Sequence, residues 1–429
     1  MSTRTQSAPA RAPGFTYRQN ALHCESVSVA DAAKRYGSPL YVYSATTIQD
    51  RFRKFDQAFS RHSHAVCYSV KANSNLSILR MLATLGAGFD VVSGGELERV
   101  LAAAPESASR VVFSGVGKTA DEMDLALRSG ILLFNLESEG ELRALAQRAA
   151  RMRKTARVSF RVNPDVHAVT HPYITTGLRE HKFGVPIRQA RRLYAEAAQF
   201  DWLEPAGISV HIGSQITDVA PFREAMERVV TLAEQLMRDG LNIGYIDAGG
   251  GLGIPYDGSH RNHFEASVRD YAKAVLGPLS GSSFHLLLEP GRIIVAPAGA
   301  LITRVLYIKQ NARKRFIVVD AGMNYLIRPS LYGAYHEIVP VVRKRSKTTK
   351  ADVVGPVCES GDFFAKNREL PELEEGDLVA ILDAGAYGMS ISSNYNTRPR
   401  PAEVLVNGNQ ARLIRHREKV TSLFSEEQI

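Results

Sequence analysis

Cysteine is scarce in this chain, with three among 429 residues. Cys24, Cys67 and Cys358 cannot form a network of disulfides, which excludes the small secreted domains that depend on one. We therefore expect reduced thiols and a cytoplasmic location. Long apolar runs are also missing, because no stretch approaches the roughly 20 residues that a membrane-spanning helix needs. The segment from Met1 to Phe15 lacks the apolar core of a secretory signal, and we expect it to be a loose tail.

Acidic residues are outnumbered, since 53 Lys and Arg against 44 Asp and Glu give a formal net charge of +9. Such a chain could bind nucleic acid, or its basic surface could attract small anionic ligands. The densest basic run, Arg343–Lys350, holds no aromatic residue on which a base could stack. We therefore expect a small anionic molecule as the partner, and neither nucleic acid, nor a membrane, nor a metal.

Strands and helices alternate from about residue 64 onward. Eight short apolar runs are separated by segments whose apolar residues recur every three or four positions, as in amphipathic helices. Eight such units within about 220 residues predict a (β/α)8 barrel. A doubly wound sheet would also alternate, but eight units without a break in mid-chain favour a closed barrel. The predicted strands are His64–Ser69, Gly88–Val92, Val111–Ser114, Ile131–Leu136, Val158–Val162, Gly207–His211, Ile243–Asp247 and Phe284–Leu288.

The pattern changes after Glu289, where strand-like runs follow one another without long helices between them. This predicts a second, mainly β domain of the sandwich or barrel kind. The short strand Leu40–Tyr43, which precedes the barrel in the sequence, is expected to join this β domain. The predicted division is therefore 1–42 for a tail and strand of the β domain, 43–289 for the barrel and 290–429 for the C-terminal β domain. The later strands are Leu301–Lys309, Phe316–Val319, Val353–Val357, Leu378–Leu382 and Glu403–Val406.

Polar and glycine residues gather at the ends of four of the predicted barrel strands. In chain order these segments are Tyr68–Asn73, His211–Gln215, Asp247–Gly253 and Glu289–Arg292. Active sites of such barrels lie at the carboxyl ends of the strands, so we expect the four segments to meet there.

Together these segments suit pyridoxal 5'-phosphate (PLP). Consecutive glycines such as Gly249–Gly251 let backbone N–H groups approach a phosphate. In apolar surroundings Lys71 can lose its proton and form a Schiff base. Glu289 could hold a pyridine nitrogen protonated, and the flat ring of His211 could stack on the cofactor. Each residue alone has an ordinary explanation, such as a surface lysine, a tight turn, a core histidine or an ion pair between Glu289 and Arg292.

The same four segments resemble the fold-type III PLP-dependent decarboxylases, a group that includes the ornithine, arginine and diaminopimelate decarboxylases and shares its fold with alanine racemase. Nearly the whole chain takes part in the resemblance. Two segments of the C-terminal half also match the group: Cys358–Asp362 and Asp383–Gly388. Segments that resemble the diaminopimelate decarboxylases in particular are Arg161–Asp165, His171–Gly177, Leu326–Tyr332 and Ser393–Pro401.

The resemblance implies a role for each matching residue. Lys71 would hold PLP covalently, His211 would stack on its ring, and Glu289 would pair with its pyridine nitrogen. Cys358 would return a proton to the substrate after CO2 leaves. The residues expected around the phosphate and the rest of the cofactor are Ser214, Gly251, Pro290, Gly291, Arg292 and Tyr387.

The resemblance also implies where the substrate binds and how the chain assembles. Arg292, Arg328, Tyr332, Glu359 and Tyr387 would bind meso-diaminopimelate. The segment around Cys358 would come from the partner subunit, so the active site would lie at the interface of a homodimer. We expect Cys358, Glu359 and Asp362 to cross that interface.

Elementary chemistry favours the same substrate. An arginine binds a distal carboxylate through two N–H groups, and Glu359 suits a distal ammonium. Ornithine lacks a distal carboxylate, so it would leave Arg292 and Arg328 unpaired at a cost of about 2–5 kcal/mol. The expected reaction is therefore the decarboxylation of meso-2,6-diaminopimelate to L-lysine and CO2, the last step of lysine biosynthesis.

Three alternatives stay open. The first is a related decarboxylase that acts on ornithine, arginine or carboxynorspermidine. The second is an amino-acid racemase on the same barrel, which would have no use for residues that bind a distal carboxylate. The third is a non-catalytic homologue that regulates an enzyme, although such a protein should have lost Lys71, the glycines or Cys358. We further expect the loop Thr170–Lys182 to close over the substrate.

Overall fold

The computed structural model describes residues 13–166, 182–257, 264–311, 313–344 and 346–429. The chain divides into two compact units. The barrel unit comprises Arg51–Ile254 and Glu265–Ile293, and the β unit comprises Met1–Asp50, Pro255–Phe264 and Ile294–Ile429. The sequence placed the divisions after residues 42 and 289. It gave no sign that the segment starting at Pro255 groups with the β unit.

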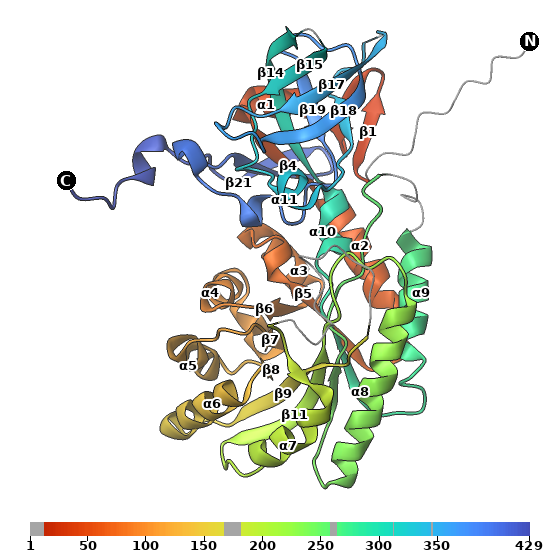
Figure 1. Cartoon of the computed structure of the whole chain (residues 1–429), viewed down its shortest axis with the longest axis vertical. Coiled ribbons are helices and arrows are strands. Elements are labelled where there is room, and N and C mark those ends of the chain that lie inside the picture. The colour runs from red at the N-terminus through yellow and green to blue at the C-terminus, as the bar shows by residue number, and fades with distance from the viewer. Residues whose placement is uncertain (1–12, 167–181, 258–263, 312, 345) are drawn as a thin grey trace, which may run out of the picture. The chain divides into compact units, whose positions relative to one another are not determined.

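The barrel unit contains a closed ring of eight parallel strands, as the sequence predicted (Figure 1). Leu286 of β13 pairs with His64 of β5, and Phe134 of β8 pairs with Val158 of β9, so the ring has no open edge. A two-residue strand, β10, adds to β9 outside the ring. The strands are β5 (His64–Ser69), β6 (Gly88–Val91), β7 (Val111–Phe113), β8 (Leu133–Leu136), β9 (Ala156–Asn163), β10 (Val185–Pro186), β11 (Leu203–Val210), β12 (Tyr245–Asp247) and β13 (His285–Leu288).

Local sequence signals set the ends of the barrel helices. The helix after β7 begins with a capping box, in which Thr119 and Glu122 satisfy each other's backbone amides, and ends at Gly130 in the left-handed conformation. The helices are α2 (Ala45–Ala58), α3 (Leu76–Thr84), α4 (Gly94–Ala103), α5 (Ala120–Ser129), α6 (Glu139–Met152), α7 (Ile187–Ala197), α8 (Ala220–Arg238), α9 (Phe264–Leu276) and α10 (Arg292–Val295).

The β unit is built on a sheet in which an N-terminal strand lies between two C-terminal ones. Strand β4 pairs with β14 on one side and with β20 on the other. Residues Leu40–Ser44 thus form a strand in the main sheet of the β unit. The strands of this sheet are β4 (Leu40–Ser44), β14 (Gly299–Asn311), β15 (Lys314–Val319), β16 (Ile338–Pro340), β17 (Thr348–Val354), β18 (Phe363–Pro371), β19 (Leu378–Ile381), β20 (Ala402–Asn407) and β21 (Gln410–Arg415).

The remaining elements of the β unit are short. A small antiparallel sheet precedes β4, and the sequence analysis did not predict it. Strands β16, β18 and β21 also went unpredicted, because β16 is only three residues long and the apolar residues of β18 and β21 are mixed with charged ones. The small sheet and the helices of this unit are β1 (Phe15–Arg18), β2 (Ala21–Cys24), β3 (Val27–Ser28), α1 (Val29–Tyr36) and α11 (Arg328–Tyr332).

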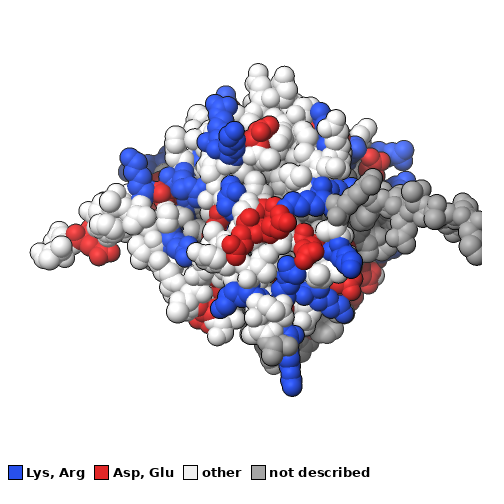
Figure 2. Space-filling model, turned by 90° about the horizontal axis from the view of Figure 1, so that it is seen from above, with Lys and Arg blue, Asp and Glu red and all other residues white. Residues whose placement is uncertain are grey.

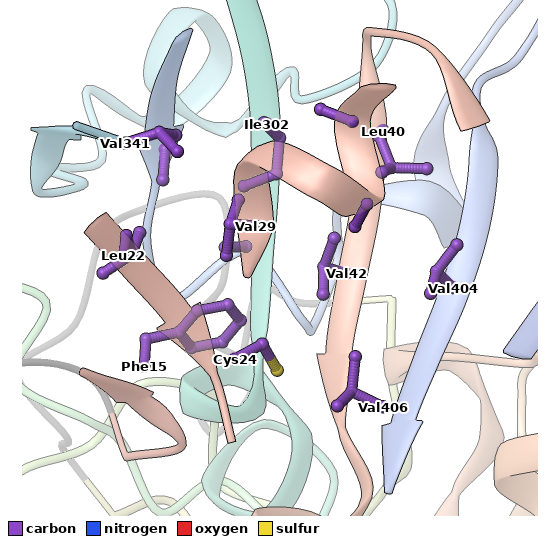
Figure 3. Packing of buried hydrophobic residues seen from close by; sticks show 14 of the residues in the cluster. Phe15, Leu22, Cys24, Val29, Leu40, Val42, Ile302, Val341, Val404 and Val406 are labelled. Carbon is purple, nitrogen blue, oxygen red and sulfur yellow. The ribbon is translucent and has the colours of Figure 1, made fainter. Parts of the chain in front are cut away.

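One apolar cluster ties the N-terminal segment of the β unit to its main sheet (Figure 3). Phe15 and Cys24 from the small sheet lie in the same core as Val42 of β4 and Val404 of β20, and all four side chains are fully buried. Burial of such side chains contributes about 1.5–3 kcal/mol each. Cys24 and Cys67 are thus core residues, whereas Cys358 is exposed.

Charged side chains of both signs are interspersed on the face of the molecule shown in Figure 2. In the β unit the basic run near residue 344 is partly neutralised, since Lys344 lies 2.7 Å from Glu374 and 2.9 Å from Asp377. Within the described ranges, no helix combines the length and the apolar character needed to cross a bilayer. The same ranges contain no group of three or more potential metal ligands.

Candidate active site

Lys71 lies immediately after β5, in a short turn of 3-10 helix from Val70 to Ala72. Its Nζ is 2.6 Å from Oδ2 of Asp90, a residue of the neighbouring strand β6. Asp90 is fully buried, whereas 35% of the Lys71 side chain is exposed. The hydroxyl of Ser69 donates to the same oxygen of Asp90, and the other oxygen, Oδ1, has no hydrogen-bond partner among the residues that the structure describes. Lys71 is thus held at the carboxyl end of the barrel by a carboxylate that could accept further bonds.

His211 follows β11 and is held in a defined protonation state. Its Nδ1 accepts a hydrogen bond of 3.2 Å from the backbone amide of Gly250, so this nitrogen carries no proton. Burial, followed by the charges of Arg161 and Lys71, keeps the pKa of His211 well below its usual value. The ring is therefore neutral, which suits a side chain that lies flat against another ring.

Three consecutive glycines after β12 form a turn that side chains could not occupy. A Cβ at Gly250 would collide with the carbonyl oxygen of Glu289, and Gly251 has a φ of +107°. The amides of Gly249 and Gly250 donate to Oδ1 of Asp247 at 2.9 Å and to Nδ1 of His211 at 3.2 Å, so Gly251 is the glycine whose backbone could face a phosphate. Nearby, the Ser214 hydroxyl accepts from Nη2 of Arg292 at 2.9 Å. Backbone amides, a hydroxyl and a guanidinium are the donors that a phosphate requires.

Pro290 and Gly291 bring the end of β13 against the Lys71 turn. The carbonyl oxygen of Pro290 accepts from the amide of Ser69 at 3.1 Å. A Cβ at Gly291 would come within 2.9 Å of the Ala72 side chain, so glycine permits this close packing. The eighth strand end is therefore fixed beside the first, as the barrel prediction required.

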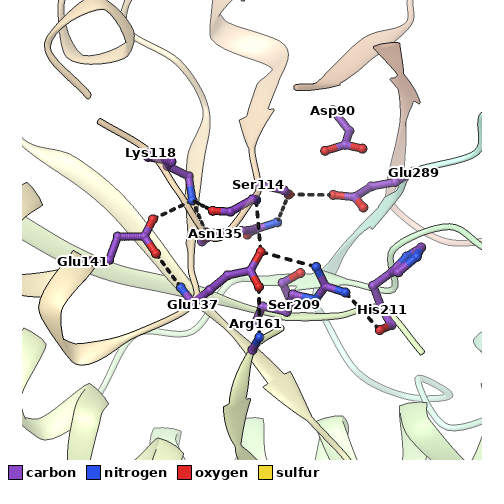
Figure 4. Close-up of polar contacts among 12 residues, drawn as sticks. Asp90, Ser114, Lys118, Asn135, Glu137, Glu141, Arg161, Ser209, His211 and Glu289 are labelled. Carbon is purple, nitrogen blue, oxygen red and sulfur yellow. Dashed lines mark hydrogen bonds and ion pairs between the residues drawn. The ribbon is translucent and has the colours of Figure 1, made fainter. Parts of the chain in front are cut away.

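Glu289, labelled in Figure 4, is buried beside a second carboxyl group, that of Asp247. Burial, together with the charges of Asp247 and Asp90, raises the pKa of Glu289 well above its usual value. Burial also raises the pKa of Asp247, which accepts bonds from Asn135 at 2.7 Å and Ser209 at 3.1 Å. Burial and the charge of each carboxyl group on the other thus favour a proton shared by the pair.

A second buried polar cluster lies where β7, β8 and β9 end (Figure 4). Lys118 Nζ donates to Glu141 at 2.6 Å, and Glu141 accepts from the amide of Glu137 at 2.8 Å. Glu137 in turn faces Arg161, whose Nη2 lies 3.4 Å from the carbonyl oxygen of His211. This cluster fixes the backbone that carries His211 and was not predicted from the sequence.

These residues fit PLP. The barrel unit gathers a half-exposed lysine, a neutral flat histidine, a protonated carboxyl group and a set of phosphate donors at one end. The orphaned Oδ1 of Asp90 and the glycine turn are features of this structure that such a cofactor would use. The barrel unit therefore brings together, as the sequence predicted, Lys71, His211, Ser214, Gly251 and Glu289, with Pro290, Gly291 and Arg292 beside them.

The other predicted residues belong to the β unit. Arg328 and Tyr332 stand one helical turn apart on α11, with Arg328 buried and Tyr332 half-buried. Ser330 of the same helix donates to the carbonyl oxygen of Gly361 at 2.5 Å. This bond places α11 beside the turn that carries Cys358 and Glu359, both of which are exposed.

Asp362 shapes that turn from inside its own chain. Its carboxylate accepts from the backbone amides of Met323 at 2.6 Å and Val357 at 2.7 Å, and 5% of the residue is exposed. Its oxygens thus bind backbone of the same chain, and the expectation that Asp362 crosses a subunit interface stays a prediction. The amide of Cys358 is held separately, by Oδ1 of Asn396 at 2.9 Å.

Tyr387 and the loop Thr170–Lys182 are the remaining residues to which the sequence analysis gave a role. Tyr387 lies half-buried in the loop after β19, with a φ of +52° that few side chains adopt. The proposed lid at Thr170–Lys182 and the segment His171–Gly177 lie outside the described residues, except for Lys182. The sequence analysis missed Asp90 and the cluster around Glu137, and it named Asp247 as the start of a strand-end segment without giving it a role. Their signal was only a polar residue within a buried strand or at its end.

Comparisons with known proteins agree with this geometry. Residues 45–296 match the family model described as pyridoxal-dependent decarboxylase, pyridoxal binding domain. Over 415 residues the chain is 50% identical to a diaminopimelate decarboxylase of Pseudomonas aeruginosa, covering 97% of this chain and 99% of that protein. The crystal structure of diaminopimelate decarboxylase from Helicobacter pylori complexed with L-lysine is 43% identical, with a TM-score of 0.88 over 93% of this chain and 98% of that one. The corresponding structure from M. jannaschii is 35% identical, with a TM-score of 0.91 over 97% and 98% of the two chains.

Proposed function

Because the chain belongs to the pyridoxal-dependent decarboxylases, and among them to the diaminopimelate decarboxylases, we propose that it converts meso-2,6-diaminopimelate to L-lysine and CO2. It is a carboxy-lyase with PLP as its cofactor. The observation that carries the proposal is the meeting of Lys71, His211, Glu289 and the glycine turn at one end of a closed barrel. Lysine biosynthesis is the process that such an enzyme serves.

Bound PLP would supply an electron sink for the pair that the departing carboxylate leaves behind. The chain's own residues prepare the site for this. Lys71 holds the cofactor, and Asp90 keeps the lysine side chain directed to the end of the barrel. The buried carboxyl of Glu289 can exchange its proton with a ring nitrogen without taking up one from solvent, because its pKa is raised.

The substrate proposal rests on charge matching. The distal end of meso-diaminopimelate carries a carboxylate and an ammonium, for which arginine and glutamate side chains are the natural partners. We assign the carboxylate to Arg328 and Arg292, the ammonium to Glu359, and supporting contacts to Tyr332 and Tyr387. The reacting carboxylate would be the one at the D centre, since the product is L-lysine.

We also propose a homodimer in which Cys358 and Glu359 of one subunit complete the site of the other. Both are exposed on a turn that Asp362 and Asn396 hold in shape. In this arrangement Cys358 returns the proton to the substrate carbon after CO2 has left. We place the protein in the cytoplasm, because all three of its cysteines are free thiols.

The direct test is to measure CO2 and lysine released from meso-diaminopimelate by the PLP-loaded protein. L-ornithine, L-arginine and carboxynorspermidine are tested separately as alternative substrates of the same reaction class. We expect lysine from the first substrate and at least 100-fold lower kcat/KM for the others, which corresponds to the cost of an unpaired guanidinium. Turnover of ornithine or arginine at a comparable rate would overturn the assignment of the substrate.

A further inference from the structure

Arg328 is in contact with a buried histidine that none of the functional assignments above includes. Nη1 of Arg328 lies 2.7 Å from Nε2 of His336. The arginine is 4% exposed and the histidine 0%. Both residues belong to the β unit, so this contact forms within one compact part of the chain.

The second nitrogen of His336 determines the protonation state of the first. Nδ1 lies 2.8 Å from the carbonyl oxygen of Leu382, which can only accept a hydrogen bond. Nδ1 must therefore carry the proton, and Nε2 of the neutral ring presents a lone pair. A guanidinium can only donate, so the bond runs from Arg328 to His336.

An aromatic ring holds the guanidinium from a second direction. The Cζ atom of Arg328 lies 4.1 Å from the centroid of the Tyr256 ring, a cation–π distance. The same ring meets His336 edge-on, with centroids 5.1 Å apart and planes at 62°. His336 thus fixes one N–H group in the guanidinium plane, and Tyr256 fixes the plane itself.

The histidine is anchored by rigid structure and not by a loose loop. Strand β16 begins two residues later and pairs with β19, and the amide of Leu382 donates to the carbonyl of Glu337 at 2.9 Å. The carbonyl of His336 also accepts from Nη1 of Arg368 at 2.8 Å. Backbone bonds on both sides of the ring therefore set its place before any ligand binds.

We propose that His336, together with Tyr256, is a positioning residue that orients the guanidinium of Arg328 toward the α-carboxylate at the non-reacting end of the substrate. The proposal rests on the function proposed above. A guanidinium recognises a carboxylate through two parallel N–H groups, so its plane and rotation decide the strength of the pair. His336 controls the rotation, and Tyr256 controls the plane.

The test compares two ligands of the PLP-loaded protein that differ by one group. L-Lysine carries an α-carboxylate at the end that would face Arg328, and cadaverine is the same diamine without it. We expect His336→Phe to weaken L-lysine binding by about 10–100-fold, the effect of losing a hydrogen bond to a charged group. Cadaverine binding should change by less than about 3-fold, within the effect of a lost neutral contact. KM for meso-diaminopimelate should rise more than kcat falls.

His336→Gln is the matched variant, because its amide can accept from Arg328 and donate to Leu382. It should restore most of the affinity for L-lysine. Tyr256→Leu provides a second route if His336→Phe does not fold, and it should also weaken L-lysine selectively. The proposal is overturned if L-lysine binds His336→Phe and Tyr256→Leu as tightly as the unchanged protein, or if both ligands weaken equally.

The release of lysine by the unchanged protein tests the proposed function separately from the role of His336. If the unchanged protein does not release lysine from meso-diaminopimelate, the proposed function fails whatever the variants do. If it does release lysine but the variants keep their affinity for it, only the role of His336 fails.

Discussion

Nζ of Lys71 and Oδ2 of Asp90 lie 2.6 Å apart at the end of two adjacent barrel strands, β5 and β6. The carboxylate is fully buried and the ammonium is not. A buried carboxylate without a cation is costly, so the pair stabilises the site before any cofactor binds. It also ties the position of Lys71 to the register of the barrel rather than to a loop.

The first prediction concerns this pair in the cofactor-free protein. Lys71→Met should lower the free energy of unfolding by about 1–3 kcal/mol, because Asp90 is left buried without its cation. Asp90→Asn in the same chain should recover part of that loss, giving a coupling energy of about 0.5–3 kcal/mol. Urea unfolding of the two single variants and the double variant measures it.

The exposed pair Lys54–Glu265 is the matched control in the same unit. Its atoms are 2.9 Å apart, with 40% and 69% of the side chains exposed. The corresponding double-mutant cycle should give a much smaller coupling energy than the buried pair, because water screens both charges. Equal coupling in the two cycles would show that burial of Asp90 does not matter.

The second prediction separates the chemical role of Glu289 from its structural one. Burial raises the pKa of this carboxyl well above its usual value and so favours the protonated form, which Gln resembles in shape and charge. Glu289→Gln should therefore keep the free energy of unfolding within about 1 kcal/mol. It cannot exchange a proton with a ring nitrogen, so kcat should fall by about 100–1,000-fold, as on loss of a preorganised electrostatic partner.

Ser114→Ala serves as the comparison for Glu289. It removes the hydroxyl that lies 3.3 Å from Oε1 of Glu289 but leaves the carboxyl in place. Its kcat should fall by less than about 10-fold, the usual effect of one neutral hydrogen bond. A Glu289→Gln variant as active as Ser114→Ala would contradict the role given to the carboxyl group.

The third prediction is a pH dependence that arises from Glu96 on α4. Burial raises the pKa of this carboxyl to about 7, against the opposing effects of the Val92 amide and Lys71. The folded state thus binds the proton more tightly than the unfolded state, whose pKa is about 4.3. The stability from this group is complete below about pH 4 and is lost as the pH rises to about 7.

Glu96→Gln should remove this dependence, because its amide does not titrate and can still accept from Val92. Relative to the variant, the unchanged protein should lose up to about 3 kcal/mol between pH 4.5 and 7.5. Urea unfolding at four pH values across this range measures the difference. Parallel stability curves for the two proteins would mean that Glu96 is ionised alike in the folded and unfolded states.

The barrel was predictable because its signals are local. Each strand is a short apolar run and several helices carry their own caps, as the Thr119–Glu122 box and Gly130 show. The motif residues at the strand ends were also found, because the topology alone brings the ends of parallel strands together. Lys71 and Glu289 needed no knowledge of distant contacts to be placed at one end.

The partners of those residues could not be found in the same way. Asp90 and Asp247 stand in or at the end of apolar strands, and no local pattern says that one will face Lys71 and the other Glu289. His336 is eight residues from Arg328, but its tautomer depends on Leu382, more than forty residues further on. The segment from Pro255 joins the β unit through contacts such as Tyr256 with Arg328, which sequence spacing does not reveal.

The last prediction tests the shared site of the proposed homodimer. Lys71→Ala removes the residue that holds the cofactor, and Cys358→Ala removes the proposed proton donor, so each variant alone should have little activity. If Cys358 serves the partner's barrel, a mixed dimer contains one site with both residues intact and one with neither. Random exchange of subunits makes half of the dimers mixed, so mixing equal amounts should restore about a quarter of the full activity. Activity that stays at the level of the separate variants, after exchange has been verified by mass spectrometry of tagged subunits, would mean that Cys358 acts within its own chain or not at all.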